Sequence, residues 1–284
     1  VRRRRSGRRV LRSGGHAQKP SLDHVRTPLQ VQELTRNLRH PWTTLTLVPE
    51  SASTNADLVR ASGRGEAAAW TVLVAEHQSA GKGRLGRTWT SVPGTGLTFS
   101  ALVPVPDQPG WVPLITGLAL VEAITSRYAV RTSLKWPNDL LGQIGDEAVE
   151  RKVAGILCEL TAAGIVIGIG LNVDQDEGEL PVPGAGSLRL LAGEHSEGLT
   201  RERLLLDILD RLAERLVQWG RDPEGVRTAY RGRCVTLGRE VRIDLGARGQ
   251  ASGRAIGVDD DGRLVVDLGG RTEAFSAGDV THVR

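Results

Sequence analysis

The residues with the most evident chemistry lie in one stretch, 76–89, which reads EHQSAGKGRLGRTW. Glycine lets backbone N–H groups approach phosphate oxygens closely, and arginine pairs with phosphate through two parallel hydrogen bonds. The stretch therefore indicates a loop that binds a polyanion, with a merely solvated basic loop as the alternative. Its glycines and cations alternate at Gly81, Lys82, Gly83, Arg84, Gly86 and Arg87, and Trp89 closes it.

A second cluster lies in SLKWPNDLL, residues 133–141. Lys135, Asn138 and Asp139 place a cation, an amide and a carboxylate within five residues, and these groups suit a phosphate and its magnesium ion. Proline disfavours helix in the residue before it, so we expect a short strand at 134–136 and then a turn. A turn without any chemistry is the alternative.

Further polar residues lie where a helix is expected to begin. The segment SASTNADLVR follows a strand at 43–48, which we expect Pro49 to end, and Ser53 or Thr54 can cap a helix that runs to about Ala61. Hydroxyl and amide groups at a helix N-terminus can also bind a small polar ligand group, although capping alone would explain them.

Two β-rich runs, 151–160 and 164–173, are separated by a short turn and predict a hairpin. Lys152 opens the first run, Gly155 interrupts it as a bulge or a close-packing site, and Asn172 ends the second. Common nucleotide motifs do not explain these residues, because GK lacks the Walker spacing and GKGRLG opens no helix of a βαβ unit. A nucleotide site outside those two classes is implied.

The remaining apolar pattern predicts the elements that hold these groups. Apolar residues recur at helical spacing from Trp111 to Tyr128 and predict an amphipathic helix, and Thr200 can cap another that runs to about Trp219. The stretch 174–197 is rich in glycine, proline and acids and predicts a loop. Further strands are expected at 70–77 and 95–103, and a short helix at 223–230.

The pattern changes after residue 230. Short β-rich runs separated by DDDG and LGGR turns predict a small SH3-like barrel, with strands at 240–245, 251–258, 263–268, 272–276 and 280–283. We therefore expect a disordered basic tail at 1–41, a catalytic domain at 42–230 and the β domain at 231–284.

Charge is distributed unevenly along the 284 residues. Residues 1–40 carry ten arginines and one lysine against two acids, so they have a net charge of +9 and the remaining 244 residues have −5, for a total of +4. A mildly acidic folded part argues against a protein that binds along nucleic acid through its charge.

No apolar run reaches the roughly 18 residues of a membrane helix. Two cysteines, Cys158 and Cys234, fit neither a zinc site nor a disulfide framework. We expect a cytoplasmic protein with two buried thiols.

Together these motifs resemble the biotin protein ligases, in that family's order and at about its spacing. The resemblance covers roughly residues 43–284 and implies an α+β fold, with a mixed β-sheet catalytic domain of the biotin/lipoate ligase, class II synthetase-like type. It implies the monofunctional bacterial type, because about 40 preceding residues are too few for the DNA-binding domain of bifunctional relatives. The matching motifs are STN at 53–55, AGKGRLGRTW at 80–89, KWPND at 135–139, RKVAGIL at 151–157 and GIGLN at 168–172.

By this resemblance the enzyme uses ATP and Mg²⁺ to activate biotin as biotinyl-5'-AMP, then transfers it to a lysine of a biotin carboxyl carrier domain. The glycine loop would close over the adenylate and exclude water. No dedicated protein metal site is expected. The resemblance assigns biotin binding to Ser53, Thr54, Asn55, Gln78, Lys82, Gly83, Arg84, Lys152 and Gly155, with the ureido ring at Ser53, Thr54 and Gln78. It assigns nucleotide binding to Arg84, Arg87, Trp89, Lys135, Asn138 and Asn172, with adenine on Trp89. It assigns catalysis to Arg84, Lys135, Asp139 and Lys152, with Lys152 between carboxylate and α-phosphate and Asp139 steering or deprotonating the incoming lysine.

One residue departs from the family pattern, because Lys82 stands where arginine is more common and cannot make a two-toothed contact.

Two other functions remain open. A lipoate or octanoate ligase or transferase would have the same fold, and a nucleic-acid-binding regulator would use the basic tail and the small barrel. The carrier domain is the expected partner of a monomer or homodimer, with no membrane contact and no specific DNA binding.

Overall fold

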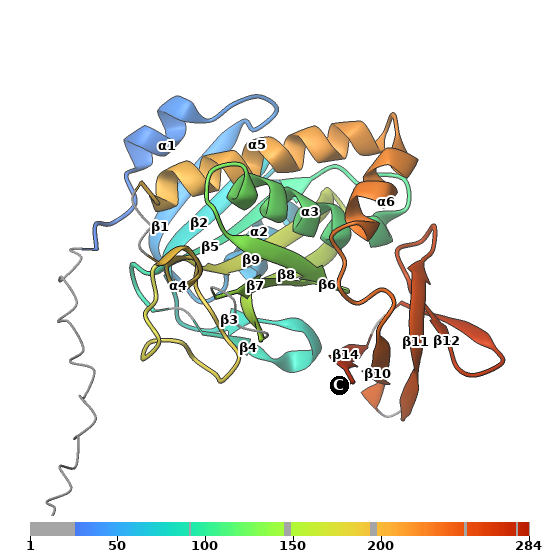
Figure 1. The fold of residues 1–284 in the computed structure, drawn as a ribbon. Helices are drawn as coiled ribbons and strands as arrows, with labels where there is room; N and C mark the ends of the chain where they lie inside the picture. The colour runs from blue at the N-terminus through green and yellow to red at the C-terminus, as the bar shows by residue number, and fades with distance from the viewer. Residues whose placement is uncertain are drawn as a thin grey trace, which may run out of the picture.

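The computed structural model of the chain describes residues 26–90, 92–144, 149–193, 198–246, 249–276 and 278–283. A seven-stranded sheet with helices on both faces forms the larger part, and a five-stranded sheet lies beside one end of it (Figure 1). This is the α+β fold that the sequence predicts. No helix of the described residues is long and apolar enough to cross a membrane.

The large sheet is mixed, with the strand order β1-β2-β5-β9-β8-β7-β6. Strands β1 and β2 run parallel, and the other neighbouring pairs are antiparallel. Side chains alternate between the two faces of a strand, so β2, β5 and β9 contribute both to a large core and to a small cluster under α2, Thr54–Gly63. The strands span Thr44–Ser51 (β1), Thr71–Gln78 (β2), Gly96–Val103 (β5), Arg131–Lys135 (β6), Asp139–Gln143 (β7), Glu150–Thr161 (β8) and Gly164–Asn172 (β9).

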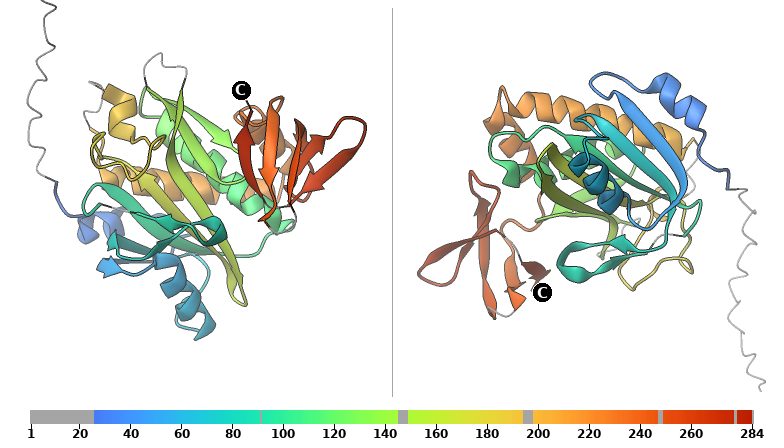
Figure 2. Two further views of the ribbon diagram at one scale, coloured as in Figure 1. Left: turned by 90° about the horizontal axis from the view of Figure 1, so that it is seen from below. Right: turned by 180° about the vertical axis from the view of Figure 1, so that it is seen from behind.

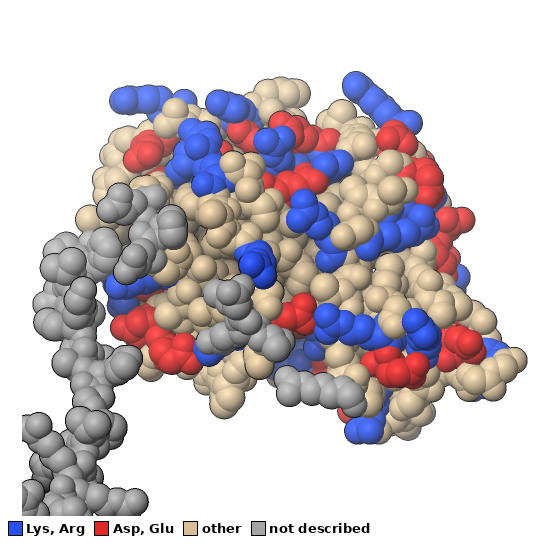
Figure 3. All heavy atoms as spheres, in the orientation of Figure 1, with Lys and Arg blue, Asp and Glu red and all other residues tan. Residues whose placement is uncertain are grey.

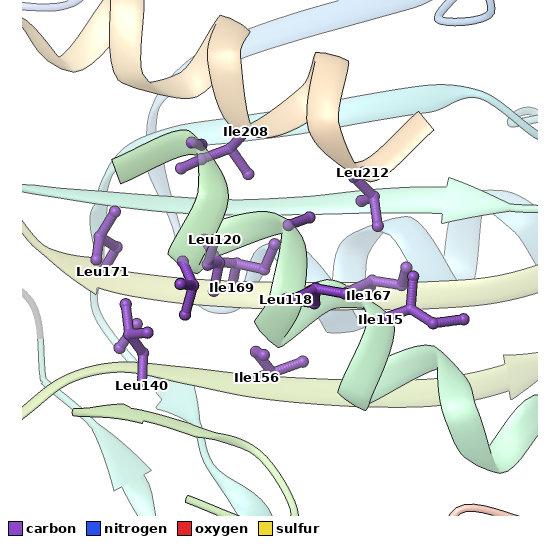
Figure 4. Close-up of a cluster of buried hydrophobic side chains, with 14 of the residues drawn as sticks. Ile115, Leu118, Leu120, Leu140, Ile156, Ile167, Ile169, Leu171, Ile208 and Leu212 are labelled. Carbon is purple, nitrogen blue, oxygen red and sulfur yellow. The ribbon is translucent and has the colours of Figure 1, made fainter. Parts of the chain in front are cut away.

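Helix α3, Val112–Thr125, lies at the centre of the large core, between the sheet and α5, Arg201–Trp219. Figure 4 shows Leu118 of α3 beside Ile167 of β9. A helix covered on both sides must be apolar nearly all round, and α3 is. The predicted amphipathic character is therefore wrong, and the helix ends before Tyr128.

Two other local predictions are wrong. The stretch 174–197, expected to be a loop, contains the short helix α4, Leu188–Ala192, which Ser187 caps; five residues show too little periodicity to be recognised. Strand β1 continues through Pro49, because it is an edge strand and one side of its backbone has no ladder partner. The remaining predicted strands and the helices α5 and α6, Pro223–Arg231, agree with the structure apart from small shifts at their ends.

The segment 26–41 is folded against the large sheet and its helices, so its assignment to a disordered tail is wrong. It contains α1, Val31–Asn37, and it buries Leu29 and Leu34 in the large core. These apolar residues are too few to give a periodic signal, and they are buried by partners far away in the chain. The prediction for residues 1–25 lies outside the described residues.

A buried ion pair holds this N-terminal segment in place. Arg201 Nη1 donates to Glu76 Oε2 at 2.8 Å, and its Nη2 donates to the Thr27 carbonyl at 2.8 Å. The Leu29 N–H donates to the same carboxylate. The segment therefore supplies hydrogen-bond partners to a charge pair that is largely withdrawn from water.

The C-terminal strands form an antiparallel sheet in the order β13-β12-β11-β10-β14, consistent with the predicted SH3-like domain (Figure 2). Its β11–β12 turn contacts two buried indoles of the larger part of the molecule. The Trp136 Nε1–H donates to the Gly262 carbonyl at 3.0 Å, and the Trp111 Nε1–H donates to the Asp259 carbonyl at 3.1 Å. These bonds fix the C-terminal sheet against the larger part of the molecule. Its strands span Glu240–Asp244 (β10), Gln250–Val258 (β11), Leu264–Asp267 (β12), Thr272–Phe275 (β13) and Asp279–His282 (β14).

Candidate functional site

A cavity of about 110 Å³ brings together nearly all of the predicted site residues. The glycine loop and the start of α2 border it on one side, the β6–β7 turn borders it on the other, and residues 278–280 of the C-terminal sheet reach its rim. Asn172 does not line it. The predicted residues that do are Ser53, Thr54, Asn55, Gln78, Lys82, Gly83, Arg84, Arg87, Trp89, Lys135, Asn138, Asp139, Lys152 and Gly155.

One end of the cavity is a neutral, hydrogen-bonded group of side chains at the start of α2. The Thr54 N–H and Oγ1–H both donate to Gln78 Oε1, at 2.8 and 3.0 Å. Ser100 Oγ lies 2.8 Å from Thr54 Oγ1 and donates to Asn55 Oδ1 at 3.0 Å. Ser53 caps the helix by accepting from the Ala56 N–H. All of these polar side chains are buried, so their donors and acceptors are held in place before any ligand arrives.

The glycine loop forms a small hairpin from β3, Gly81–Lys82, and β4, Thr88–Trp89, with a tight turn at its tip. Gly81 is required by space, because a Cβ there would overlap the Trp89 carbonyl oxygen. Gly86 has a φ of 73°, which favours glycine. Lys82 is exposed at the cavity mouth and has no ion pair with any of the described residues.

The two arginines of the loop face different partners. Arg84 points into the cavity and its Nη1 donates to Asn138 Oδ1 at 3.2 Å. Burial lowers the pKa of the Arg84 guanidinium, while the carboxylates of Asp139 and Asp279 act in the opposite direction. Arg87 instead forms an ion pair with Asp279 of β14. The loop tip is thus joined to the C-terminal sheet.

The Trp89 ring lies on a shelf made by two glycines of neighbouring strands. A Cβ at Gly170 of β9 would overlap the ring, and one at Gly155 of β8 would come within 3.2 Å of its Cζ3. Gly155 is therefore a close-packing site, and the register irregularity of β7 and β8 lies beside Leu140 instead. Lys152 Nζ lies 5.9 Å from the ring centroid, within reach of a cation–π contact.

The opposite end of the cavity carries the charged groups. Lys152 Nζ lies 2.6 Å from Asp139 Oδ1, an ion pair whose angles are not those of a hydrogen bond. Lys135 is the cross-strand neighbour of Asp139 in the β6–β7 hairpin, and no described residue forms an ion pair with it. Asn138 Nδ2 donates to the Ile156 carbonyl at 3.0 Å, which fixes the turn onto β8. Two lysines and one carboxylate therefore converge on one point.

Asn172 has a structural position. Its side chain is buried, donates to the Gly186 carbonyl at 2.9 Å and accepts from Gln175 Nε2 at 3.3 Å. These bonds hold the segment before α4 against the end of β9. The structure does not place this residue among those that line the cavity.

Three residues that shape the site were not among the sequence predictions. Ser100 links Thr54 to Asn55, Glu159 accepts from the Asn55 amide, and Asp279 pairs with the loop. Ser100 lies in a strand that the sequence does predict, but its contact with α2 depends on which strands are neighbours. Asp279 has no local signal at all, because its partner lies 192 residues earlier.

Comparison with known proteins gives consistent matches. Residues 53–176 match the model of the biotin/lipoate A/B protein ligase family, and residues 236–283 match that of the biotin protein ligase C-terminal domain. The chain is 38% identical over 272 residues to the biotin–[acetyl-CoA-carboxylase] ligase of Mycobacterium tuberculosis, covering 92% of this chain and 98% of that protein. It is 30% identical over 239 residues to the protein of the same name from Paracoccus denitrificans, covering 78% and 92%. A biotin protein ligase from Aquifex aeolicus, solved in complex with biotin and ATP, aligns with a TM-score of 0.71 at 29% identity, covering 85% of this chain and 99% of that one.

Proposed function

Because this chain belongs to the biotin protein ligases of the biotin/lipoate A/B protein ligase family, we propose that it activates biotin with ATP and transfers it to a lysine of a biotin carboxyl carrier domain. One observation carries the proposal. The cavity has a neutral polar end at Thr54 and Gln78 and a cationic end at Lys135 and Lys152. Biotin has the same polarity, with a neutral ureido ring at one end and a carboxylate at the other.

In the first half-reaction, a carboxylate oxygen of biotin attacks the α-phosphorus of ATP. The bond from this phosphorus to the bridging oxygen breaks, and pyrophosphate leaves with the bonding electron pair. Two anions must approach each other, so cations beside the reacting atoms lower the repulsion and stabilise the transferring charge. In our proposal Lys152 contacts both the carboxylate and the α-phosphate, and Lys135 and Arg84 approach from either side. The Trp89 ring would stack on adenine.

In the second half-reaction, the amine of the carrier lysine attacks the acyl carbon of the mixed anhydride. An amide bond forms, AMP leaves, and the attacking nitrogen loses a proton. Asp139 is the carboxylate closest to Lys152, at 2.6 Å, and so lies beside the position that the anhydride would occupy. We propose that it steers the incoming amine and accepts its proton.

The residues fit a magnesium ion that arrives with ATP. Such an ion is usually held by one or two carboxylates, by water and by substrate phosphates. Among the described residues, no three His, Cys, Asp or Glu side chains are grouped to hold a metal. Asp139 lies at the charged end of the cavity and pairs with Lys152 through Oδ1, so this carboxylate is our candidate protein ligand. The ion would screen the negative charge of the phosphates.

The glycine loop is proposed as the cover of the adenylate. Its hairpin presents Lys82, Gly83 and Arg84 to the cavity, and its ion pair through Arg87 with Asp279 anchors the tip to the C-terminal sheet. A loop held by this ion pair and by the hydrogen bond from Arg84 to Asn138 can exclude water from a hydrolysable anhydride and still open when these two contacts break.

Two alternatives have less support. A lipoate ligase would have the same fold, but the relatives at 38% and 30% identity are named as biotin ligases, and the C-terminal match is to the biotin protein ligase domain. A nucleic-acid-binding regulator would need a basic face, whereas basic and acidic side chains are interspersed on the face in Figure 3.

We further propose a cytoplasmic monomer or homodimer, in keeping with two free cysteines, Cys158 and Cys234.

The test is to incubate the purified protein with ATP, Mg²⁺ and an apo carrier domain, with biotin in one sample and lipoate in another. Mass spectrometry of the carrier should show the added mass of one biotinyl group and none of lipoyl. A carrier whose acceptor lysine is replaced by arginine is the matched control. Lipoylation, or no ATP-dependent modification in the biotin sample, would contradict the proposal.

A further inference from the structure

A second cavity of about 360 Å³ lies behind the charged end of the first. The two share Lys135, Asp139 and Lys152, while the residues of the neutral end line only the first. The second cavity lies between the β6–β8 part of the large sheet and the C-terminal sheet. It adds Glu150 of β8, Arg239 just before β10, and His282 of β14.

This second cavity is polar and carries more positive than negative charge. Lys135, Lys152 and Arg239 face Asp139 and Glu150. Arg239 Nη1 donates to Glu150 Oε2 at 3.1 Å. Lys135 has no carboxylate partner among the described residues, so one positive charge is left over.

The state of His282 agrees with this excess of positive charge. Burial, and after it the cations Arg239 and Lys135, lower the pKa of its ring to about 4, although Glu150 acts in the opposite direction. The neutral ring accepts from Arg239 at Nδ1, at 3.0 Å, and its Nε2 lies 3.1 Å from Thr236 Oγ1. The histidine therefore orients Arg239 without adding charge.

We propose that this second cavity receives the pyrophosphate released in the first half-reaction, and that Arg239 is a pyrophosphate-binding residue. The inference rests on the proposed function. Displacement at the α-phosphorus is in line, so the leaving oxygens depart on the side opposite the attacking carboxylate. With biotin entering from the neutral end, that opposite side lies beyond Lys152 and Lys135, where the second cavity begins. In the reverse step a pyrophosphate oxygen attacks the same phosphorus, and the biotin carboxylate leaves with the electron pair.

The ion pair of Arg239 with Glu150 gives the proposal a distinctive signature. Either Arg239→Gln or Glu150→Gln breaks the pair, so a purely structural pair would respond equally to both substitutions. A pyrophosphate site would respond differently to the two substitutions. Losing Arg239 removes a charged donor, whereas losing the Glu150 carboxylate releases Arg239 and removes a charge that repels pyrophosphate.

The experiment is biotin-dependent exchange between ATP and labelled pyrophosphate, measured with the full-length chain over a range of pyrophosphate concentrations. We expect Arg239→Gln to raise the half-saturating pyrophosphate concentration by about tenfold or more, the usual effect of losing a charged hydrogen bond. Glu150→Gln should leave it unchanged or lower it. Arg242→Gln, at an exposed position of β10, is the charge-matched control and should have no effect. Transfer from added biotinyl-adenylate to the carrier uses no pyrophosphate and should be normal in all three variants.

Three results would overturn the inference. The half-saturating pyrophosphate concentration could rise equally in Arg239→Gln and Glu150→Gln, or it could fail to rise in Arg239→Gln. The third result is a loss of the transfer step in Arg239→Gln that is as large as its loss of exchange. A wild-type chain without biotin-dependent exchange would instead refute the proposed function, so the two failures can be told apart.

Discussion

Replacing Leu34 with alanine tests whether the N-terminal segment is part of the folded domain. Leu34 lies in α1, and its side chain is 0% exposed in the large core. Leucine-to-alanine changes at such positions cost about 2–5 kcal/mol, from lost burial and from the cavity left behind. For a chain of this size each kcal/mol lowers the midpoint of thermal unfolding by about 2–4 °C. We therefore expect Leu34→Ala to lower that midpoint by about 4–20 °C.

Circular dichroism on heating measures this midpoint, and Gln32→Ala is the matched control. Gln32 lies on the exposed side of the same helix, where substitutions usually change stability by less than about 0.5 kcal/mol. A disordered tail would make the two variants indistinguishable, and that result would refute the packing of α1. Comparing chains that begin at residue 26 and at residue 39 extends the test, because only the second lacks Leu29 and Leu34. Deleting residues 1–38 should therefore lower stability, because it removes both of these buried side chains.

Three further predictions concern the site. Lys152→Ala should slow adenylate formation by about a hundredfold or more, since it removes the cation proposed for the reacting atoms; biotin-dependent pyrophosphate release measures this, and a near-normal rate would remove Lys152 from the site. Gly170→Ala should push the Trp89 ring off its shelf and lower kcat/KM for ATP by about twofold to tenfold. Gly178→Ala is the control, because a Cβ there would make only an ordinary contact, 3.7 Å from Asp176 Oδ1, and equal values for the two variants would exclude a role for the shelf. His282→Gln should make the free energy of unfolding depend less on pH in the acid range. The folded-state pKa of about 4 lies below the usual 6.5, so the unfolded chain binds more protons than the folded chain between these values. In the wild type the stability therefore falls as the pH drops through that window. Urea unfolding at pH 4.5 and pH 7 measures this, and parallel pH profiles for wild type and variant would contradict it.

Much of the site could be predicted because its signals are local. Ser53 caps α2, and Lys135 and Asp139 are brought together by a turn of three residues. A helix cap and a hairpin turn depend on neighbours a few positions away, and the sequence shows those neighbours directly. The cavity then gathers these local pieces because the strands that carry them belong to one sheet.

The features that could not be predicted depend on distant partners. Leu34 is buried by residues of the large core, Arg87 pairs with Asp279, and Asn172 is held by a hydrogen bond to the Gly186 carbonyl. None of these partners lies near its residue in the chain, and no periodicity marks the contact. The buried character of α3 could not be predicted for a related reason. The sheet covers one side of this helix, and α5, which lies well over 70 residues later, covers the other.

The contact between Arg87 and Asp279 has a consequence for how the two domains communicate. If the docked C-terminal sheet helps to order the loop, then a ligand that orders the loop must tighten the docking of that sheet by the same free energy, because coupling between two sites is reciprocal. Biotinyl-adenylate bound in the cavity should therefore slow amide hydrogen exchange in β14. Asp279→Asn should uncouple the two, so that the ligand protects the loop but no longer protects the strand.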